Sequence, residues 1–278
     1  ADINGISVDN ICVGTGSGEI LSVSGLMASM NGGSIVCADP TYQNLLRYAE
    51  RAGAEIIRVP VNESLSPDLD AMRRAVRSDT DMVYLVNPNN PIPSVLNGDE
   101  MREFVIEMAK DRLVFVDEAY HEYVDDPDYQ SMVGLIAEGY NNIIVSRTAS
   151  KIHGLAGLRV GFGYAHPDLI TKMWQMKTGD PSVIALEAAR VSYLDNEFAA
   201  YSIRKNNEAK KIVADMCEEL GLRYIKSNAN FTFIETGFEN KVVQEKLREY
   251  GILTGRDFPP YHTSWSRISM SKPEEMEY

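Results

Sequence analysis

The feature that most limits the fold of this chain is a repeated alternation of short apolar runs with amphipathic stretches between residues 18 and 165. The apolar runs are rich in β-branched residues and only a few residues long, which is typical of buried strands. Strands that alternate with helices form βαβ units around a mainly parallel sheet. The expected strands are 34–38, 55–60, 81–86, 112–117, 143–146 and 159–165, and the expected helices are 18–31, 42–52, 67–77, 98–110 and 129–138.

The pattern changes near residue 167, where long helical stretches begin. The later elements are expected to be a long helix at 196–220, a strand at 230–236, a helix at 241–251 and a last strand at 266–270. We therefore expect an α/β fold of two domains. The large domain spans 1–166, and a helical connection with a smaller α+β domain spans 167–278.

Composition removes several classes of partner. The chain has 40 acidic and 27 basic residues and a formal net charge of −13, which disfavours nucleic acids and anionic membranes as partners. Its three cysteines are far apart and its four histidines lack metal-ligand spacing, so we expect neither a disulfide framework nor a metal site. No apolar run reaches the ~18 residues of a membrane span, and we expect a cytoplasmic protein. The chain starts without methionine and stops inside an acidic run, which indicates a fragment.

Polar residues cluster where the expected strands end. Residues 87–91 (NPNNP), 117–120 (DEAY) and 146–151 (SRTASK) each follow a buried strand. In an open α/β sheet, ligands bind outside the carboxyl ends of the strands. The segment 11–20 adds three glycines just before a helix, with Ser17 as the expected N-cap, and such a helix start offers unpaired N–H groups to a phosphate.

Two other motifs compete for these segments. The glycine-rich segment could be a dinucleotide-binding fingerprint, but its spacing is G-x-G-x-G rather than G-x-G-x-x-G. The strand 112–117 with Glu118 matches the Walker B strand of an ATPase, but the required G-x-x-x-x-G-K-[ST] is absent upstream. Each motif is weak alone, and the combination of motifs discriminates better.

The segments GSGE, ADPTY, NPNNP, VFVDEAY, SRTASKIHGLAGLRVGF and SRISMSKPEE occur in this order along the chain. In these segments and their order the chain resembles the class I/II aminotransferases, fold-type I enzymes that use pyridoxal phosphate (PLP), and most closely the histidinol-phosphate aminotransferase branch. The resemblance implies a mostly parallel central sheet flanked by helices and a smaller C-terminal α+β domain. It also implies a homodimer.

The resemblance assigns roles around the cofactor ring. Lys151 is the amine that would form the imine with the PLP aldehyde, and its apolar, sparsely charged setting would keep it nucleophilic. Asp117 would hold a proton on the pyridine nitrogen. Asn90 and Tyr120 would bond the 3-oxygen of the ring, and Tyr42 would stack on its face. Lys151, Asp117 and Tyr120 are thus the expected catalytic residues.

The resemblance also assigns the phosphate anchors. Ser17 and Gly18 would supply backbone donors at a helix start, and Thr148 and Ser150 would supply hydroxyl groups. Arg159 would supply the charge, because its planar guanidinium suits a phosphate.

The substrate is less determined. By resemblance Arg267 would grip an α-carboxylate, and Arg256 would bind a distal phosphate or carboxylate of the substrate. Tyr261 and Trp265 could contact an aromatic ring of the substrate, or they could equally be core residues. We expect histidinol phosphate as the amino donor and 2-oxoglutarate as the acceptor. Alternatives are an aromatic amino-acid donor, a decarboxylase or C–S lyase with the same anchors, and a PLP-binding pseudoenzyme.

Two departures from the family pattern stand out. The family usually reads Asn-Pro-Thr-Gly where this chain has Asn90-Pro91-Ile92-Pro93, which removes a hydroxyl group and a backbone donor. The family's N-terminal arm, which covers the substrate, has no counterpart in the sequence given.

Overall fold

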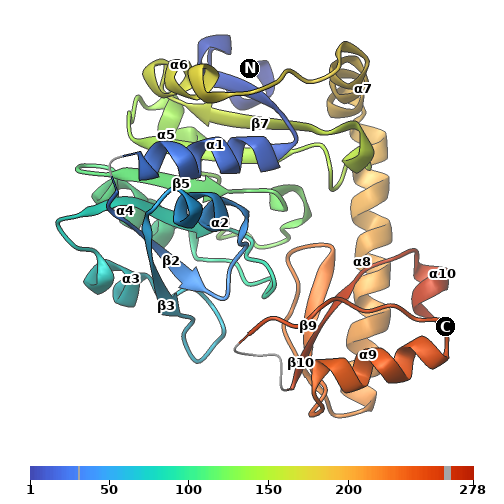
Figure 1. The fold of residues 1–278 in the computed structure, drawn as a ribbon. Helices are drawn as coiled ribbons and strands as arrows, with labels where there is room; N and C mark the ends of the chain where they lie inside the picture. The colour runs from blue at the N-terminus through green and yellow to red at the C-terminus, as the bar shows by residue number, and fades with distance from the viewer. Residues whose placement is uncertain (31, 260–263) are drawn as a thin grey trace.

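The computed structural model describes residues 1–30, 32–259 and 264–278, and its centre is a seven-stranded sheet (Figure 1). The strand order is β1-β7-β6-β5-β4-β2-β3. Strands β2 to β6 run parallel, and β7 runs antiparallel to its neighbours β1 and β6. The predicted α/β class with a mostly parallel sheet is therefore confirmed. The strands are Ile11–Thr15 (β1), Ser34–Asp39 (β2), Glu55–Pro60 (β3), Thr80–Val86 (β4), Leu113–Asp117 (β5), Ile143–Thr148 (β6) and Val160–Ala165 (β7).

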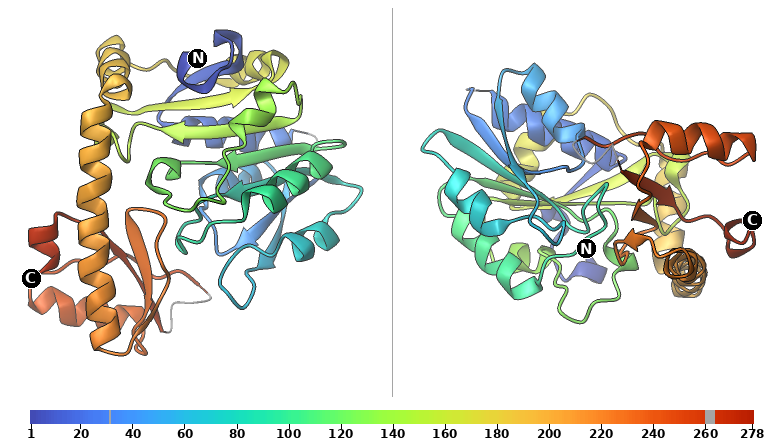
Figure 2. Two further views of the ribbon diagram at one scale, coloured as in Figure 1. Left: turned by 180° about the vertical axis from the view of Figure 1, so that it is seen from behind. Right: turned by 90° about the horizontal axis from the view of Figure 1, so that it is seen from below.

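Helices cover both faces of this sheet (Figures 1 and 2). Alternate residues of a strand point to opposite faces, so in β4 Val83 and Leu85 join one apolar core while Met82 and Tyr84 join the other. The first core is closed by α3 (Leu69–Ala75), α4 (Gly98–Met108) and α5 (Val133–Ala137), and the second by α1 (Ser17–Ser29), α2 (Asn44–Arg51) and α6 (Pro167–Met176). Because these strands are buried on both faces, their sequences are continuous apolar runs rather than alternating patterns.

The glycine-rich segment 11–20 differs from its interpretation in the sequence. Its first half is the strand β1, and α1 begins at Ser17, so the N-cap is Gly16 rather than Ser17. Gly16 has φ of 80°, a left-handed conformation that favours glycine. A Cβ atom there would lie 2.2 Å from Nη2 of Arg159. Glu19, in the first turn, accepts hydrogen bonds from the backbone N–H and the hydroxyl group of Thr15, and Gly16 leaves room for Arg159 beside the start of this helix.

A second sheet, of three antiparallel strands in the order β10-β9-β8, is formed by the C-terminal part of the chain. We call residues 1–176 the large lobe and the described residues of 196–278 the small lobe. Helix α8, of 24 residues, runs along both lobes (Figure 2). The remaining elements are α7 (Val183–Leu194), α8 (Asn196–Glu219), β8 (Arg223–Tyr224), β9 (Phe231–Glu235), α9 (Asn240–Glu249), β10 (Trp265–Ser269) and α10 (Pro273–Met276).

The predicted division of domains at residue 167 stays a prediction, although the two sheets lie on either side of it. In the described part of the chain, no helix combines the length and the apolar character needed to cross a membrane.

Candidate active site

A cavity of about 360 Å³ lies at the carboxyl ends of β4, β5 and β6, where the start of α1 and the small lobe also meet. All of the predicted site residues except Arg256 line it. The lining residues are Ser17, Gly18, Tyr42, Val86, Asn90, Asp117, Ala119, Tyr120, Thr148, Ser150, Lys151, Ala156, Arg159 and Arg267. The strand-end rule explains this convergence, because the carboxyl ends of neighbouring parallel strands meet at one edge of the sheet.

Asp117 is the last residue of β5 and is buried. Its Oδ1 accepts a hydrogen bond of 2.8 Å from Oγ of Ser146, the residue beside it on β6. Burial raises the pKa of Asp117 to about 6, even though the Ser146 hydrogen bond and the charge of Lys151 oppose the rise. The site therefore contains a carboxyl group that is ready to pair with a cationic partner.

Lys151 lies in the turn that follows β6, and its Nζ is 5.0 Å from the centroid of the Tyr120 ring. Burial lowers the pKa of Lys151, and the positive charge of Arg267 lowers it further, whereas Asp117 acts in the opposite direction. A lysine with a lowered pKa has a larger neutral fraction near neutral pH, and the neutral amine is the nucleophile.

Tyr120 follows β5 and packs edge-on against Phe231 of the small lobe, with ring centroids 5.1 Å apart. Its hydroxyl oxygen accepts a hydrogen bond of 3.3 Å from Nδ2 of Asn90, so the two predicted partners of one ring oxygen do lie together. Burial raises the pKa of Tyr120 to about 12. Tyr42, at the mouth of the cavity, is 39% exposed and therefore has a face available for a ligand.

One end of the cavity is rich in donors. The N–H groups of Ser17 and Gly18 open α1, where the first turn has no partners within the helix. Thr148 and Ser150 share a hydrogen bond of 2.9 Å between their hydroxyl groups, and Nη1 of Arg159 lies 3.4 Å from Oγ of Ser150. Backbone N–H groups, hydroxyl groups and a guanidinium together form a suitable cradle for a phosphate.

Arg267 approaches the cavity from β10 of the small lobe, and its guanidinium carbon lies 4.0 Å from the centroid of the Phe231 ring. Its Nε is buried and has no hydrogen-bond partner among the described residues. A buried guanidinium N–H without a partner is costly, and a carboxylate is the ligand that would satisfy it.

Arg256 and Trp265, which were also predicted near the substrate, do not line the cavity. Arg256 is exposed and stands outside the lining, with its guanidinium carbon 4.8 Å from the centroid of the Phe258 ring. Trp265 is 4% exposed and stacks on Phe233 at 5.1 Å, so it belongs to the core of the small lobe. Tyr261 lies outside the described residues.

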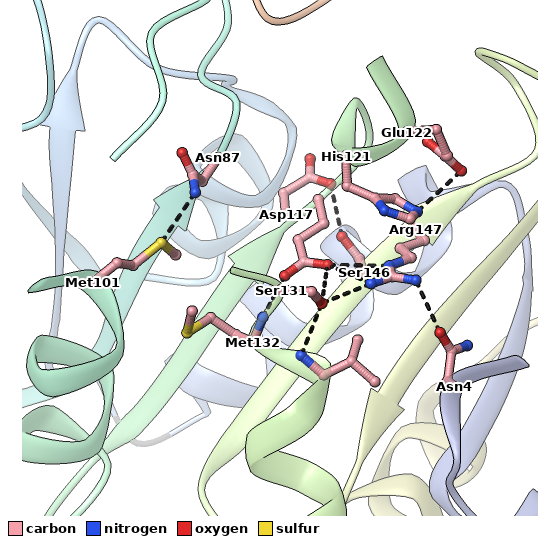
Figure 3. A network of polar contacts seen from close by, with 12 residues as sticks. Asn4, Asn87, Met101, Asp117, His121, Glu122, Ser131, Met132, Ser146 and Arg147 are labelled. Carbon is pink, nitrogen blue, oxygen red and sulfur yellow. Dashed lines mark hydrogen bonds and ion pairs between the residues drawn. The ribbon is translucent and has the colours of Figure 1, made fainter. Parts of the chain in front are cut away.

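Sequence reasoning missed a buried polar network around Glu118 and Arg147, next to Asp117 in the chain (Figure 3). Glu118 pairs with Nη2 of Arg147 at 2.9 Å, and its Oε2 also accepts a bond of 2.8 Å from Oγ of Ser131. Its Oε1 accepts a bond of 2.7 Å from the N–H of Met132. These contacts fix the chain that follows β5, which carries Tyr120. The only signal in the sequence is an arginine inside an otherwise apolar strand segment.

The donor set fits PLP. The cradle at the start of α1 suits its phosphate, the Asp117 carboxyl group suits its pyridine nitrogen, and the Lys151 amine suits its aldehyde. Two glycines make this cradle possible: a Cβ at Gly16 would meet Arg159, and one at Gly161 would lie 2.0 Å from the backbone nitrogen of Ser17. Among the described residues, no group of three or more His, Cys, Asp and Glu side chains is placed to hold a metal ion.

Comparison with known proteins agrees with this chemistry. The family model described as aminotransferase class I and II matches residues 3–278. A histidinol-phosphate aminotransferase from Brevibacillus brevis is 33% identical over 276 residues, which cover 99% of this chain and 75% of that protein.

Solved structures are similar over nearly the whole chain. One from Erwinia carotovora atroseptica, provisionally named a histidinol-phosphate aminotransferase, has a TM-score of 0.95 at 32% identity and covers 100% of this chain and 81% of its own. The histidinol-phosphate aminotransferase from Sinorhizobium meliloti, solved in complex with pyridoxal-5'-phosphate, has a TM-score of 0.90 at 24% identity, with coverages of 98% and 75%. The latter likeness shows the fold.

Proposed function

The chain belongs to the class I and II aminotransferase family, and for this aminotransferase we propose histidinol phosphate as the amino donor and 2-oxoglutarate as the acceptor. The enzyme has the fold-type I architecture and uses PLP as its cofactor. Its substrates are an amino donor and a 2-oxo acid.

The observation that carries the proposed site is the convergence of the Lys151 amine, the Asp117 carboxyl group and the Arg267 guanidinium on one cavity. When bound, PLP supplies a ring that takes up the electrons released from the donor Cα. Nζ of Lys151, whose pKa is lowered by burial, accepts the proton that leaves that carbon. Asp117 holds the proton on the pyridine nitrogen, and Ser146 orients its carboxyl group from β6.

Recognition of an anionic substrate is supported by two cationic side chains in a chain of net charge −13. Arg267 has a buried, unpaired Nε beside the cavity and binds the α-carboxylate of glutamate or the acceptor. Burial lowers the pKa of Arg267, and the charge of Arg256 lowers it further, which is consistent with two cations close together. Arg256 binds the distal phosphate of histidinol phosphate. An aromatic amino-acid donor has less support, because phenylalanine carries no distal anionic group for Arg256 to bind.

The test is a donor panel with the protein, PLP and 2-oxoglutarate. Histidinol phosphate, glutamate with a second 2-oxo acid, and phenylalanine are each supplied, and the oxo product is identified by mass spectrometry. We expect the oxo product of histidinol phosphate, and none with Lys151→Ala. Release of CO₂ from glutamate or phenylalanine in place of an oxo product would instead identify a decarboxylase, and release of sulfide from added cysteine would identify a C–S lyase. PLP binding without any product would identify a pseudoenzyme.

The role of Arg256 is tested by replacing it with alanine. Loss of one charge-assisted contact should lower kcat/KM roughly 10- to 100-fold for histidinol phosphate and leave that for phenylalanine nearly unchanged. Arg248→Ala, at an exposed position of α9, is the matched control and should change neither. An equal fall for all donors would mean that Arg256 is structural and would remove the main support for the donor.

We also propose that the large domain spans 1–166, that the helical connection and small domain span 167–278, and that the enzyme is a homodimer in the cytoplasm. The two separate sheets support the division into domains.

A further inference from the structure

Ile92 lies in the loop between β4 and α4 and is fully buried, although a loop residue is usually exposed. It belongs to an apolar cluster that draws on both lobes. We call this the Ile92 cluster: Val61, Leu65 and Ile92 from the large lobe, Phe233 and Trp265 from the small lobe, with Ile225 and Phe258 of the small lobe packed against them. Its members come from segments that are far apart in the sequence, so the cluster exists only when the lobes are in contact.

The cluster reaches both proposed substrate arginines. Phe233 of β9 lies directly opposite Arg267 of β10, and Trp265 precedes Arg267 by two residues on the same strand. Cross-strand partners and residues two apart share one face of a sheet, so all three side chains leave the same face. The ring of Phe258 lies 6.5 Å from that of Phe233, measured between centroids. The Arg256 guanidinium packs over the same Phe258 ring.

The same loop also reaches the cofactor side of the cavity. Asn90, two residues before Ile92, lines the cavity and donates to the Tyr120 hydroxyl group. The carbonyl oxygen of Pro93, one residue after Ile92, accepts a hydrogen bond of 3.3 Å from the backbone N–H of Asn228 in the small lobe. One short loop therefore contacts the cavity through Asn90 and holds the small lobe through Ile92 and Pro93.

We propose that Ile92 is a positioning residue that sets where Arg267 and Arg256 stand relative to the cavity, by fixing the small lobe on the large one. Ile92 does not line the cavity, and it acts through Phe233, Trp265 and Phe258. Trimming its side chain loosens this contact while the phosphate cradle, Asp117 and Lys151 in the large lobe keep their places. Donor binding then weakens more than the chemical step. The kinetic part of this inference rests on the proposed function.

The experiment compares Ile92→Ala and Ile92→Val with Ile35→Ala and Ile35→Val. Ile35, on β2, is equally buried, but it lies in the core of the large lobe away from the small lobe. All variants are made in a Trp174→Phe background, so that Trp265 is the remaining tryptophan of the two in the chain. The readouts are KM and kcat for the amino donor, PLP binding by titration, and the emission wavelength of Trp265.

For Ile92→Ala we expect KM to rise about fivefold or more, with kcat and PLP affinity within about twofold of the parent, and Trp265 emission at longer wavelength as water reaches the cluster. Ile92→Val should give smaller changes in the same direction. If the alanine variants do not fold, the comparison of Ile92→Val with Ile35→Val tests the proposal. Equal KM and equal emission in the Ile92 and Ile35 pairs would overturn the proposal. If the parent transaminates no donor, the proposed function fails, and the emission of Trp265 alone supports or refutes the role of Ile92.

Discussion

At the scale of single residues, Asp117 should make the stability of the protein depend on pH. In the unfolded chain its carboxyl group has a pKa near 3.8, and burial raises the pKa to about 6 in the folded, cofactor-free protein. A carboxyl group whose pKa is higher in the folded than in the unfolded protein contributes to the free energy of unfolding. This contribution is fully present below pH 3.8 and is lost as pH rises through 6. Ionised Asp117 therefore costs the cofactor-free protein about 3 kcal/mol at pH 8.

Asp117→Asn removes this cost and keeps an oxygen that can accept the bond from Ser146. Without PLP, we expect the variant to be more stable than the parent by about 3 kcal/mol at pH 8 and by about half as much at pH 5. Urea unfolding at the two pH values measures the difference. Asp111→Asn, whose side chain is 80% exposed, is the control and should show no such dependence. An advantage that is the same at both pH values would contradict the burial argument. Transamination by Asp117→Asn should fall steeply.

The positions of some site residues could be predicted from the sequence, whereas the contacts of others could not. Asp117 and Lys151 each follow an apolar strand, so their convergence could be predicted from the parallel sheet alone. Ser146 was not recognised as the partner of Asp117, because their contact depends on the register between β5 and β6. The pairing of Arg147 with Glu118 has the same origin. No single segment encodes such a register.

At the scale of elements, the contact of β7 with the start of α1 should be intolerant of change. A Cβ atom at Gly161 would lie 2.0 Å from the backbone nitrogen of Ser17, and a backbone atom cannot rotate away as a side chain can. Gly161→Ala should therefore displace the phosphate cradle. We expect PLP affinity to fall tenfold or more and the melting temperature to drop by several degrees, as measured by PLP titration and thermal unfolding.

Gly134→Ala provides the comparison for this change. Gly134 is a helical residue of α5 at which an added Cβ would meet nothing within 4 Å. Alanine has the better helix propensity, so this variant should be as stable as the parent or slightly more so and should bind PLP normally. Normal PLP affinity in Gly161→Ala would mean that α1 can shift without loss of the cradle.

The elements themselves were predictable where the apolar pattern is strong. The strands β2 to β6 and the helix α8 lie within a few residues of their predicted places. Strand β1 was missed because Gly14 and Gly16 make its segment look like a loop, and its partner is β7, about 150 residues later in the chain. Its antiparallel edge position follows from tertiary pairing rather than from local preference.

At the scale of the whole molecule, helix α7 presents apolar side chains to solvent. Val183 and Ile184 are 80% and 79% exposed, and such a surface is typical of an interface. We expect the enzyme to sediment as a dimer at micromolar concentration and Ile184→Asp to shift it to the monomer. Val242→Asp, at a half-exposed position of α9 in the small lobe, is the control and should leave the dimer intact. A monomer with full activity would contradict this prediction.

Helix α8 has a mechanical consequence. Its first turns, at Ala199 and Ile203, pack against the cluster that joins Tyr120 of the large lobe to Phe231 of β9, and its far end is at Glu219. The intervening length is about 24 Å at the rise of an α-helix. A tilt of about 5° about these first turns would move the far end of the helix by about 2 Å. Substitutions of Ala199 or Ile203 are therefore expected to act on the cavity through Tyr120, without a new contact between α8 and the ligand.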